Sequence, residues 1–127
     1  MRIVTAAVLE KDGRYLICQR AEGRRLAGVW EFPGGKLEAG ETWDRALCRE
    51  LTEELELVVE PGDVLGEVLR VDGDREIRLV FVAAVCNGCM PKLPLHVHGL
   101  SAWVYPDEMQ NYEFCPADAE FLKTNKL

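Results

Sequence analysis

The chain opens with two short runs of apolar and β-branched residues. Residues 2–10 and 15–20 carry most of these positions, and an Asp-Gly pair, Asp12 and Gly13, separates them. Such a pair between two strand-like runs is a strong signal for a tight turn joining paired strands. The N-terminal region is therefore predicted to form a β-hairpin.

A second pair of strand-like runs occupies residues 63–72 and 76–86. Gly73 and Asp74 lie between the two runs and supply another turn signal. A further short run, residues 100–106, is rich in residues that favour strands. The pattern therefore predicts a second hairpin and a late strand.

Two other segments follow a helical period. Residues 42–56 have a helix-forming composition, with Thr42 at a suitable N-cap position. Residues 116–126 begin with a proline, which suits the first turn of a helix. The apolar positions expected to face the core are Trp43, Ala46, Leu47, Leu51 and Leu55 in the first segment and Ala117, Phe121 and Leu122 in the second. The chain is thus predicted to be an α/β (α+β) protein with a mixed β-sheet sandwiched between helices.

Length, composition and charge narrow the class of protein. With 127 residues, 48% hydrophobic and 29% charged, the chain suits one globular domain spanning residues 1–127. A net charge of −7 argues against binding to nucleic-acid polymers or anionic membranes, because the excess charge repels phosphates. No apolar run is long enough for a signal peptide or a membrane span. A cytoplasmic location is therefore expected.

The five cysteines form an odd set without the spacing of a disulfide framework, which fits a reducing compartment. Cys86 and Cys89 form a Cys-x-x-Cys pair. A structural zinc site usually draws on a second such pair, which the sequence lacks. A turn that carries two thiols is therefore favoured over zinc binding or redox chemistry.

The predicted central helix concentrates negative charge on one face. Glu50, Glu53 and Glu54 lie at positions i, i+3 and i+4, so their carboxylates project side by side. A hard divalent cation such as Mg²⁺ takes carboxylate oxygens and would neutralise their repulsion. For the helix alone, a solvated acidic face is an equal alternative. The Pro-Gly-Gly turn at residues 33–35, which lets the backbone approach a ligand closely, favours the metal site.

This stretch resembles the Nudix box, a signature written G-x5-E-x7-R-E-U-x-E-E-x-G-U, in which U is an aliphatic residue. The matching residues are Gly35, Glu41, Arg49, Glu50, Leu51, Glu53, Glu54 and Leu57. The last glycine of the signature is replaced by Glu56. Residues 28–35, Gly-Val-Trp-Glu-Phe-Pro-Gly-Gly, are also similar to the MutT and CTP pyrophosphohydrolase branch of the Nudix family.

The resemblance implies a Nudix fold and hydrolysis of a nucleoside diphosphate linked to another group, with Mg²⁺ or Mn²⁺ as the cofactor. By position in the signature, the implied metal ligands are Glu50, Glu53, Glu54 and the carbonyl of Gly34. Glu41 and Arg49 would support these carboxylates, and Glu53 or a neighbour would activate water. Lys36 is predicted to contact the phosphates, although a solvated lysine fits its position equally well.

The resemblance to this branch also nominates residues that contact the nucleotide: Arg20, Glu31, Phe32 and Asp118. Core packing is the alternative for Phe32, and a first-turn acid that favours the helix dipole is the alternative for Asp118. An ionised carboxylate only accepts hydrogen bonds. If Asp118 reads the base, cytosine or guanine nucleotides, including modified forms, should therefore outrank those of uracil and thymine.

Two positions depart from the family pattern. Glu56 replaces a glycine that usually ends the helix with a positive φ, where another residue costs about 1 kcal/mol. Related enzymes often carry a further glutamate six residues before the tryptophan of the late strand, and this chain has Val97 there. The neighbouring His96 and His98 offer metal or proton-transfer chemistry, although such histidines are more often plain loop residues.

These observations predict a metal-dependent pyrophosphohydrolase that converts a nucleoside triphosphate, ordinary or oxidised, into a monophosphate and pyrophosphate. Two alternatives stay open. One is hydrolysis of another nucleoside-diphosphate substrate, and the other is a non-catalytic nucleotide sensor with the same fold. A homodimer is compatible with the sequence, which does not decide the oligomeric state.

Overall fold

Strands make up most of the regular structure in the computed structural model, which describes residues 2–86 and 98–127. The strands in these residues are β1 (Arg2–Lys11), β2 (Arg14–Arg20), β3 (Trp30–Glu31), β4 (Gly34–Lys36), β5 (Val59–Asp72), β6 (Arg75–Cys86) and β7 (His98–Val104). The helices are α1 (Trp43–Leu55), the 3-10 helix η1 (Pro106–Asn111) and α2 (Pro116–Thr124). Every strand and helix predicted from the pattern is present, and β3, β4 and η1 are additions.

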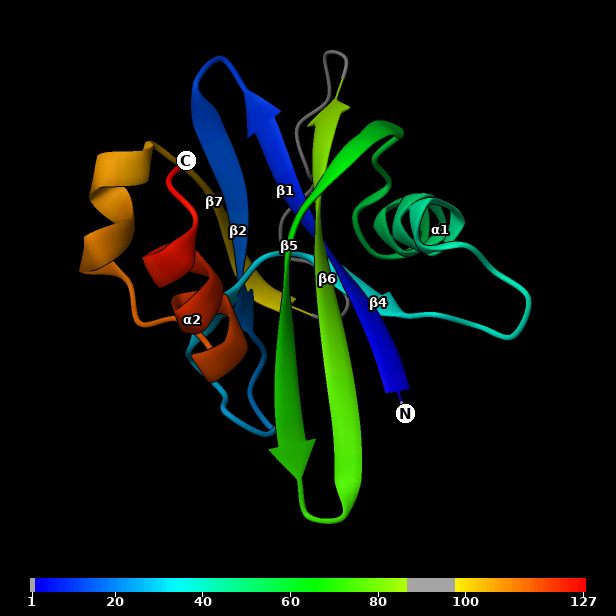
Figure 1. The fold of residues 1–127 in the computed structure, drawn as a ribbon. Helices are drawn as coiled ribbons and strands as arrows, with labels where there is room; N and C mark the ends of the chain where they lie inside the picture. The colour runs from blue at the N-terminus through cyan, green and yellow to red at the C-terminus, as the bar shows by residue number, and fades with distance from the viewer. Residues whose placement is uncertain (1, 87–97) are drawn as a thin grey trace.

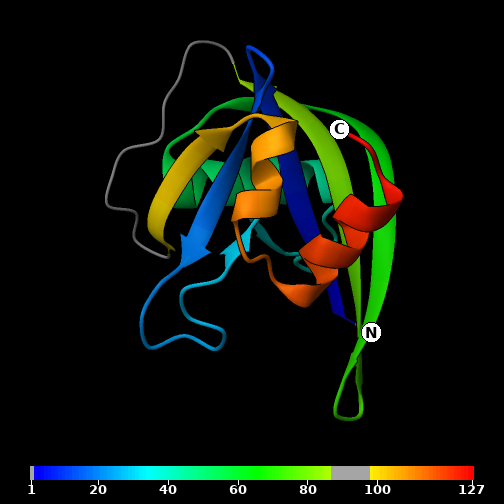
Figure 2. The same ribbon diagram turned by 90° about the vertical axis from the view of Figure 1, so that its left-hand side faces the viewer.

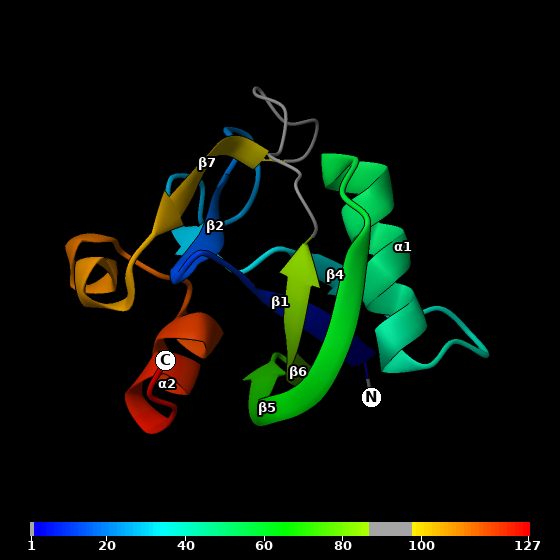
Figure 3. The ribbon, with the colours of Figure 1, turned by 90° about the horizontal axis from the view of Figure 1, so that it is seen from above.

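The strands form one mixed sheet in the order β3-β2-β1-β6-β5, with β4 added beside β1 and β7 beside β2. β1 and β6 run parallel, whereas the other pairs are antiparallel. α1 lies on one side of the sheet, and η1 and α2 lie on the other (Figure 1, Figure 3). The predicted sandwich of a mixed sheet between helices is therefore confirmed.

The first hairpin stays paired only near its turn. In the described residues, the register of β1 with β2 covers Glu10 opposite Tyr15 and Lys11 opposite Arg14. Farther from the turn, β1 pairs with β4, while β2 pairs with β3 and β7. The two strands therefore part, and β4 and the segment that follows it enter beside β1.

Apolar side chains fill the layers on both sides of the sheet. Leu51 and Leu55 of α1 pack in one cluster with Val82 of β6. On the other side, Phe81 of β6 and Phe121 of α2 are stacked with their ring centroids 4.2 Å apart. All five side chains are at most 2% exposed. Burial of this kind stabilises the fold by about 25 cal/mol per Å² of apolar surface.

The acidic helix α1 begins and ends close to the predicted residues. Its apolar face is buried at Ala46, Leu47, Leu51 and Leu55. Trp43 was expected to share this face but is 46% exposed, because it is the first residue of the helix and lies beyond the part that meets the sheet. The helix thus buries one face and leaves its carboxylates free for other contacts.

The end of α1 carries the strain expected from the sequence. Glu56 adopts the left-handed conformation, with φ 55° and ψ 34°. Its N–H donates to the carbonyls of Leu51 and Thr52, which satisfies the last turn. The N–H of Leu57 also donates to the carbonyl of Leu51 at 3.2 Å. The glutamate therefore keeps the geometry that a glycine would adopt without strain.

We expect Glu56→Gly to raise the free energy of unfolding by about 1 kcal/mol, because glycine reaches this conformation without a clash at Cβ. Urea denaturation followed by circular dichroism measures the change. Glu56→Ala is the matched control, since it removes the same charge but keeps Cβ. Equal gains in both variants would show that charge, not backbone strain, limits stability at this position.

Candidate metal and nucleotide site

Two glycines bring the acidic helix against the sheet. A Cβ atom at Gly34 would lie 1.9 Å from the carbonyl oxygen of Thr5, and one at Gly35 would lie 2.2 Å from Cδ of Glu50. No side chain fits at such distances. The Thr5 hydroxyl also donates to the carbonyl of Gly35 at 3.3 Å. The backbone of β4 is therefore held between β1 and the carboxyl group of Glu50.

Arg49 joins three parts of the Nudix-like segment. Its Nε and Nη2 donate to the two carboxylate oxygens of Glu41 at 2.7 and 2.8 Å. Nη2 also donates to the carbonyl of Lys36 at 3.0 Å, and Nη1 donates to Glu50 at 3.0 Å. The hydrogen bonds from Arg49 to Glu41, together with the one from the N–H of Glu38, lower the pKa of Glu41 to about 2. Arg49 thus connects Glu41, Glu50 and the loop before α1, and the supporting role of Arg49 and Glu41 at a metal site stays a prediction.

The carboxyl groups of Glu50 and Glu54 meet beside Gly35. The pKa of Glu54 is raised to about 8, mainly by burial and also by a hydrogen bond with Glu50 and the charge of Glu50. Two carboxyl groups this close hold a shared proton unless a cation replaces it. Their oxygens, next to the backbone of β4, are the donors that a hard divalent cation prefers. The donor set therefore fits a hard divalent cation.

Glu53 lies apart from this pair. Its side chain is 61% exposed, and its carboxylate is 3.4 Å from Nη1 of Arg49. Across residues 2–86 and 98–127, no group of three or more His, Cys, Asp or Glu side chains is arranged to hold a metal ion. The structure brings Glu50 and Glu54 together with Gly34, and the role of Glu53 as a metal ligand or base stays a prediction.

A cleft of about 740 Å³ runs alongside these carboxyl groups. Residues near β4 and α1 line it, among them Gly34, Lys36, Glu50 and Glu54. The β2–β3 segment and the start of α2 also line it, with Arg20, Leu26, Glu31, Cys115 and Asp118. The remaining lining includes residues of β1, β5 and β6. Gly34, Glu50 and Glu54 therefore share one cavity with Arg20, Glu31, Lys36 and Asp118, whereas Glu53 and Phe32 are not among its lining residues.

Arg20 and Glu31 form an ion pair in this cleft. Nη1 of Arg20 is 3.0 Å from Oε1 of Glu31, and the two side chains are 20% and 17% exposed. Nε of Arg20 donates to the carbonyl of Arg25 at 2.7 Å. The pair thus fixes both side chains at the edge of the sheet. Both residues line the cleft, and their contact with a nucleotide stays a prediction.

Asp118 lies in the first turn of α2, and its carboxyl group is buried against the cleft. The residue is 4% exposed, and its Oδ2 accepts a hydrogen bond from the N–H of Phe32 at 2.9 Å. Its pKa is raised to about 7, mainly by burial and also by the charge of Glu31, while the hydrogen bond from the Phe32 N–H offsets part of the rise. Asp118 is thus a first-turn acid of α2 that also lines the cleft, and its contact with a nucleotide stays a prediction.

The Phe32 ring lies in the hydrophobic core. The residue is 3% exposed, stacks on Phe114 at 5.9 Å between centroids and meets Phe81 and Phe121 edge-on. Its backbone, in contrast, contacts Asp118. The core-packing alternative therefore describes the ring, and a direct contact of Phe32 with substrate stays a prediction.

Comparison with known proteins decides the family. The model of the NUDIX domain matches residues 1–124. This chain belongs to the Nudix family. It is 36% identical over 121 residues to the CTP pyrophosphohydrolase of Escherichia coli K12, covering 94% of this chain and 87% of the relative. It is 40% identical over 81 residues to an 8-oxo-dGTP diphosphatase of Proteus vulgaris, covering 64% and 72%.

A solved structure supports the same assignment. The MutT protein from Methanosarcina mazei Go1 superposes with a TM-score of 0.83 at 26% identity, covering 97% of this chain and 91% of that protein. Nudix proteins with these names are hydrolases, so this chain is a Nudix hydrolase. In the described part of the chain, no helix is long and apolar enough to cross a membrane.

The Nudix signature did not reveal the strand residues that line the cleft. Arg70 of β5 and Ile77 of β6 stand opposite each other in the hairpin and both line the cavity. Strand alternation puts cross-strand partners on one face. Strand alternation does not show which face of the hairpin meets the cleft, because the orientation of the hairpin depends on the parallel pairing of β1 with β6.

Three residues of interest, Cys89, His96 and Val97, lie outside the described residues. His98 begins β7, where its backbone stands opposite Arg20. Cys86 is 6% exposed at the end of β6. The expectations for the missing glutamate and for the paired thiols therefore stay predictions.

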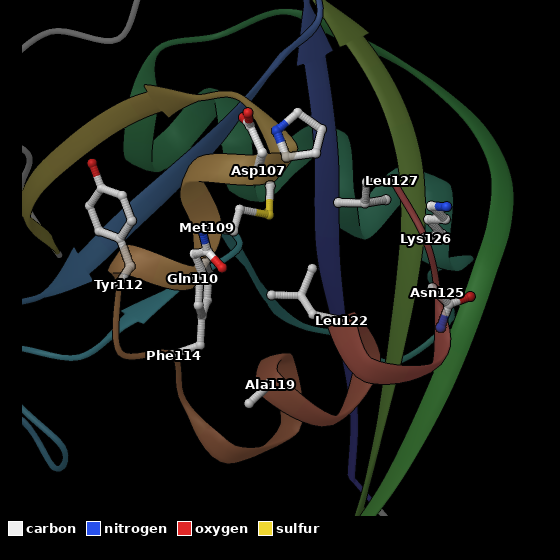
Figure 4. Close-up of a pocket in the computed structure, with 11 residues that line it drawn as sticks. Asp107, Met109, Gln110, Tyr112, Phe114, Ala119, Leu122, Asn125, Lys126 and Leu127 are labelled. Atoms are coloured by element: carbon white, nitrogen blue, oxygen red, sulfur yellow. The ribbon is translucent and has the colours of Figure 1, made fainter.

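A second cavity of this Nudix protein lies between η1 and the outer side of α2 (Figure 4). Its volume is about 550 Å³, and its lining is largely apolar, with Met109, Phe114 and Leu122 among the residues. It shares no lining residue with the cleft that holds the carboxyl groups. The chemistry predicted from the Nudix signature is therefore confined to the other cavity.

The buried carboxyl of Asp118 should make stability depend on pH. Its folded pKa of about 7 lies above the usual value of about 4, so between these values the folded state binds more protons than the unfolded state. The stabilisation is present below about pH 4 and is lost as the pH rises through 7. Asp118→Asn lacks this loss, because an amide keeps an acceptor for Phe32 but does not ionise.

We therefore expect Asp118→Asn to gain stability over the native protein between pH 4.5 and pH 7.5, on the order of 3 kcal/mol. Urea denaturation of both proteins at the two pH values measures the difference. A difference that is the same at both pH values would show that Asp118 is already ionised at pH 4.5.

Proposed function

We propose that this protein hydrolyses a nucleoside triphosphate to a nucleoside monophosphate and pyrophosphate. One observation carries the proposal: the carboxyl groups of Glu50 and Glu54 line the same cleft as Arg20, Glu31 and Asp118. A triphosphate chain needs a cation site, and a base needs polar groups at a separate place in the same cavity. The names of the two relatives, a CTP pyrophosphohydrolase and an 8-oxo-dGTP diphosphatase, support this substrate class.

Glu50, Glu54 and the carbonyl of Gly34 are the residues that would hold Mg²⁺ or Mn²⁺. When bound there, such an ion neutralises phosphate oxygens and lowers the pKa of water. Arg49 and Glu41 orient Glu50 through their hydrogen bonds.

Two further side chains complete the proposed reaction. Glu53 is exposed and paired at 3.4 Å with Arg49, and it would accept the proton of the attacking water. Lys36 is exposed at the edge of the cleft, where its ammonium group would meet the phosphate chain. The attack itself would follow an in-line geometry, with charge accumulating on oxygens that cationic groups neutralise.

Asp118 is the proposed reader of the base. Its Oδ2 already accepts the Phe32 N–H, so the carboxyl group has a fixed orientation at the wall of the cleft. Above pH 7 the ionised form only accepts hydrogen bonds, which favours the donor-rich edges of cytosine and guanine. The names of the two relatives include one cytosine and one guanine nucleotide, which agrees with this preference.

A nucleotide sensor without turnover is the alternative from a different class. The exposed position of Glu53 and the replacement of a family glutamate by Val97 favour it. A panel of ordinary and oxidised nucleoside triphosphates, a nucleotide sugar and a dinucleoside polyphosphate, each incubated with Mg²⁺, separates these possibilities. Release of pyrophosphate from a triphosphate supports the proposal, whereas binding without any product supports the sensor.

Glu54→Gln and Glu53→Gln should each reduce kcat by at least about a hundredfold in the presence of Mg²⁺, because each removes a charge from the reacting region. Chelation of the metal should abolish turnover, and added Mg²⁺ or Mn²⁺ should restore it. Circular dichroism should show both variants folded. Glu56→Gln is the matched control, since it removes a nearby charge and should keep kcat. Full activity of Glu54→Gln would disprove the assigned metal site.

Asp118→Ala should lower kcat/KM for the preferred base ten- to a hundredfold, because a charged hydrogen bond in a partly dry site is worth about 1.5–3 kcal/mol. The assay is run at pH 8, where the native carboxyl is ionised. Poor substrates should be hydrolysed at nearly unchanged rates. An equal loss for all four bases would assign Asp118 to the fold of α2 rather than to base selection.

A further inference from the structure

The loop between β2 and β3 contains a strained leucine. Leu26 has a φ of +58°, in the left-handed region that L residues with a side chain rarely occupy. Figure 2 shows this loop, coloured from blue to cyan, extending from the end of β2 at the lower left of the molecule. Such strain persists only where the surrounding structure enforces it, and it often marks functional sites.

Several hydrogen bonds enforce the conformation. The carbonyl of Leu26 accepts the N–H of Val29 at 3.3 Å, and the carbonyl of Arg20 accepts the N–H of Gly28 at 3.0 Å. Nε of Arg20 donates to the carbonyl of Arg25 at 2.7 Å, directly before Leu26. Arg20, which forms the ion pair with Glu31 in the cleft, therefore also fixes the backbone next to Leu26.

The strained conformation does not place the Leu26 side chain in the hydrophobic core. Leu26 is 46% exposed and belongs to neither apolar cluster of the described residues, yet it lines the cleft. The other non-glycine residues with positive φ in the described chain are Asp12, in a hairpin turn, and Glu56, at a helix end. Both of these are polar, and neither lines the cleft. Leu26 alone combines a strained backbone, an exposed apolar side chain and a place in the cavity.

We propose that Leu26 contacts substrate by covering one apolar face of the nucleotide base. This inference rests on the proposed function. An aliphatic side chain gives no favourable contact to phosphates, whereas the flat face of a heteroaromatic ring is apolar and gains from being removed from water. Asp118 lines the same cleft and offers hydrogen bonds suited to a ring edge. The two residues would thus divide recognition, Leu26 taking the face of the base and Asp118 its edge.

Leu26→Gly tests this inference, because glycine keeps the backbone conformation without strain and removes the side chain. We expect the melting temperature to rise by about 3 °C. At the same time, the Kd for CMP or GMP, whichever the native protein binds more tightly, should rise about tenfold through lost apolar contact. Calorimetry measures this Kd without turnover. The affinity for ribose 5-phosphate, which has no base, should stay the same.

Two control variants isolate the cause. Asp12→Gly releases similar strain away from the cleft and should raise the melting temperature with no change in Kd. Leu26→Met keeps an apolar side chain of similar size at this position and should keep the Kd within about twofold of the native value. An unchanged Kd in Leu26→Gly, or an equal loss for ribose 5-phosphate, overturns the inference, as does a native protein that binds neither CMP nor GMP. Failure of triphosphate turnover in the native protein, with monophosphate binding retained, would instead overturn the proposed function.

Discussion

The absence of side chains at Gly34 and Gly35 is the constraint on which the site depends. Any Cβ at Gly34 would overlap the backbone of Thr5, and any Cβ at Gly35 would overlap Glu50. With both positions bare, β4 packs directly on β1 and the acidic helix packs directly on β4. Arg49 can then reach the carbonyl of Lys36. A larger residue at Gly34 would push β4 away from the backbone of β1, and one at Gly35 would displace the carboxyl group of Glu50 from its present position.

The acidic residues of this segment occupy two different electrostatic environments. Glu41 faces the guanidinium of Arg49, which holds its pKa at about 2 and keeps it ionised. Glu54 faces Glu50 and little water, which raises its pKa to about 8. In the first environment, Arg49 neutralises the charge of the Glu41 carboxylate. In the second, Arg49 contacts Glu50 and the charge of Arg24 acts on Glu54, but these leave the pKa of Glu54 raised, so this environment suits a further cation from solution.

The sequence predicted what depends on local pattern and failed where the outcome depends on distant chain segments. Helical spacing located α1 to within a residue at each end, because this feature is set within one short stretch. Arg49 and Glu41, which the signature singles out, contact each other, and their role at a metal site stays a prediction. Phe32 was ambiguous since its ring is buried by residues far along the chain. Equally, the pattern of residue types did not show that Leu26 has a positive φ, because the hydrogen bonds that enforce it within residues 20–29 leave no signature in the sequence.

The parallel pairing of β1 with β6 has a consequence for how the protein folds. Arg2 stands opposite Ile77, and Glu10 stands opposite Val85, so the centre of the sheet joins segments that are distant in the chain. Closing such loops costs chain entropy before any contact compensates for it, and chains rich in non-local pairs fold slowly, in milliseconds to seconds. The strands that line the cleft belong to this same pairing. The cleft is therefore complete only once β6 pairs with β1 and the start of α2, residues 116–118, packs beside them.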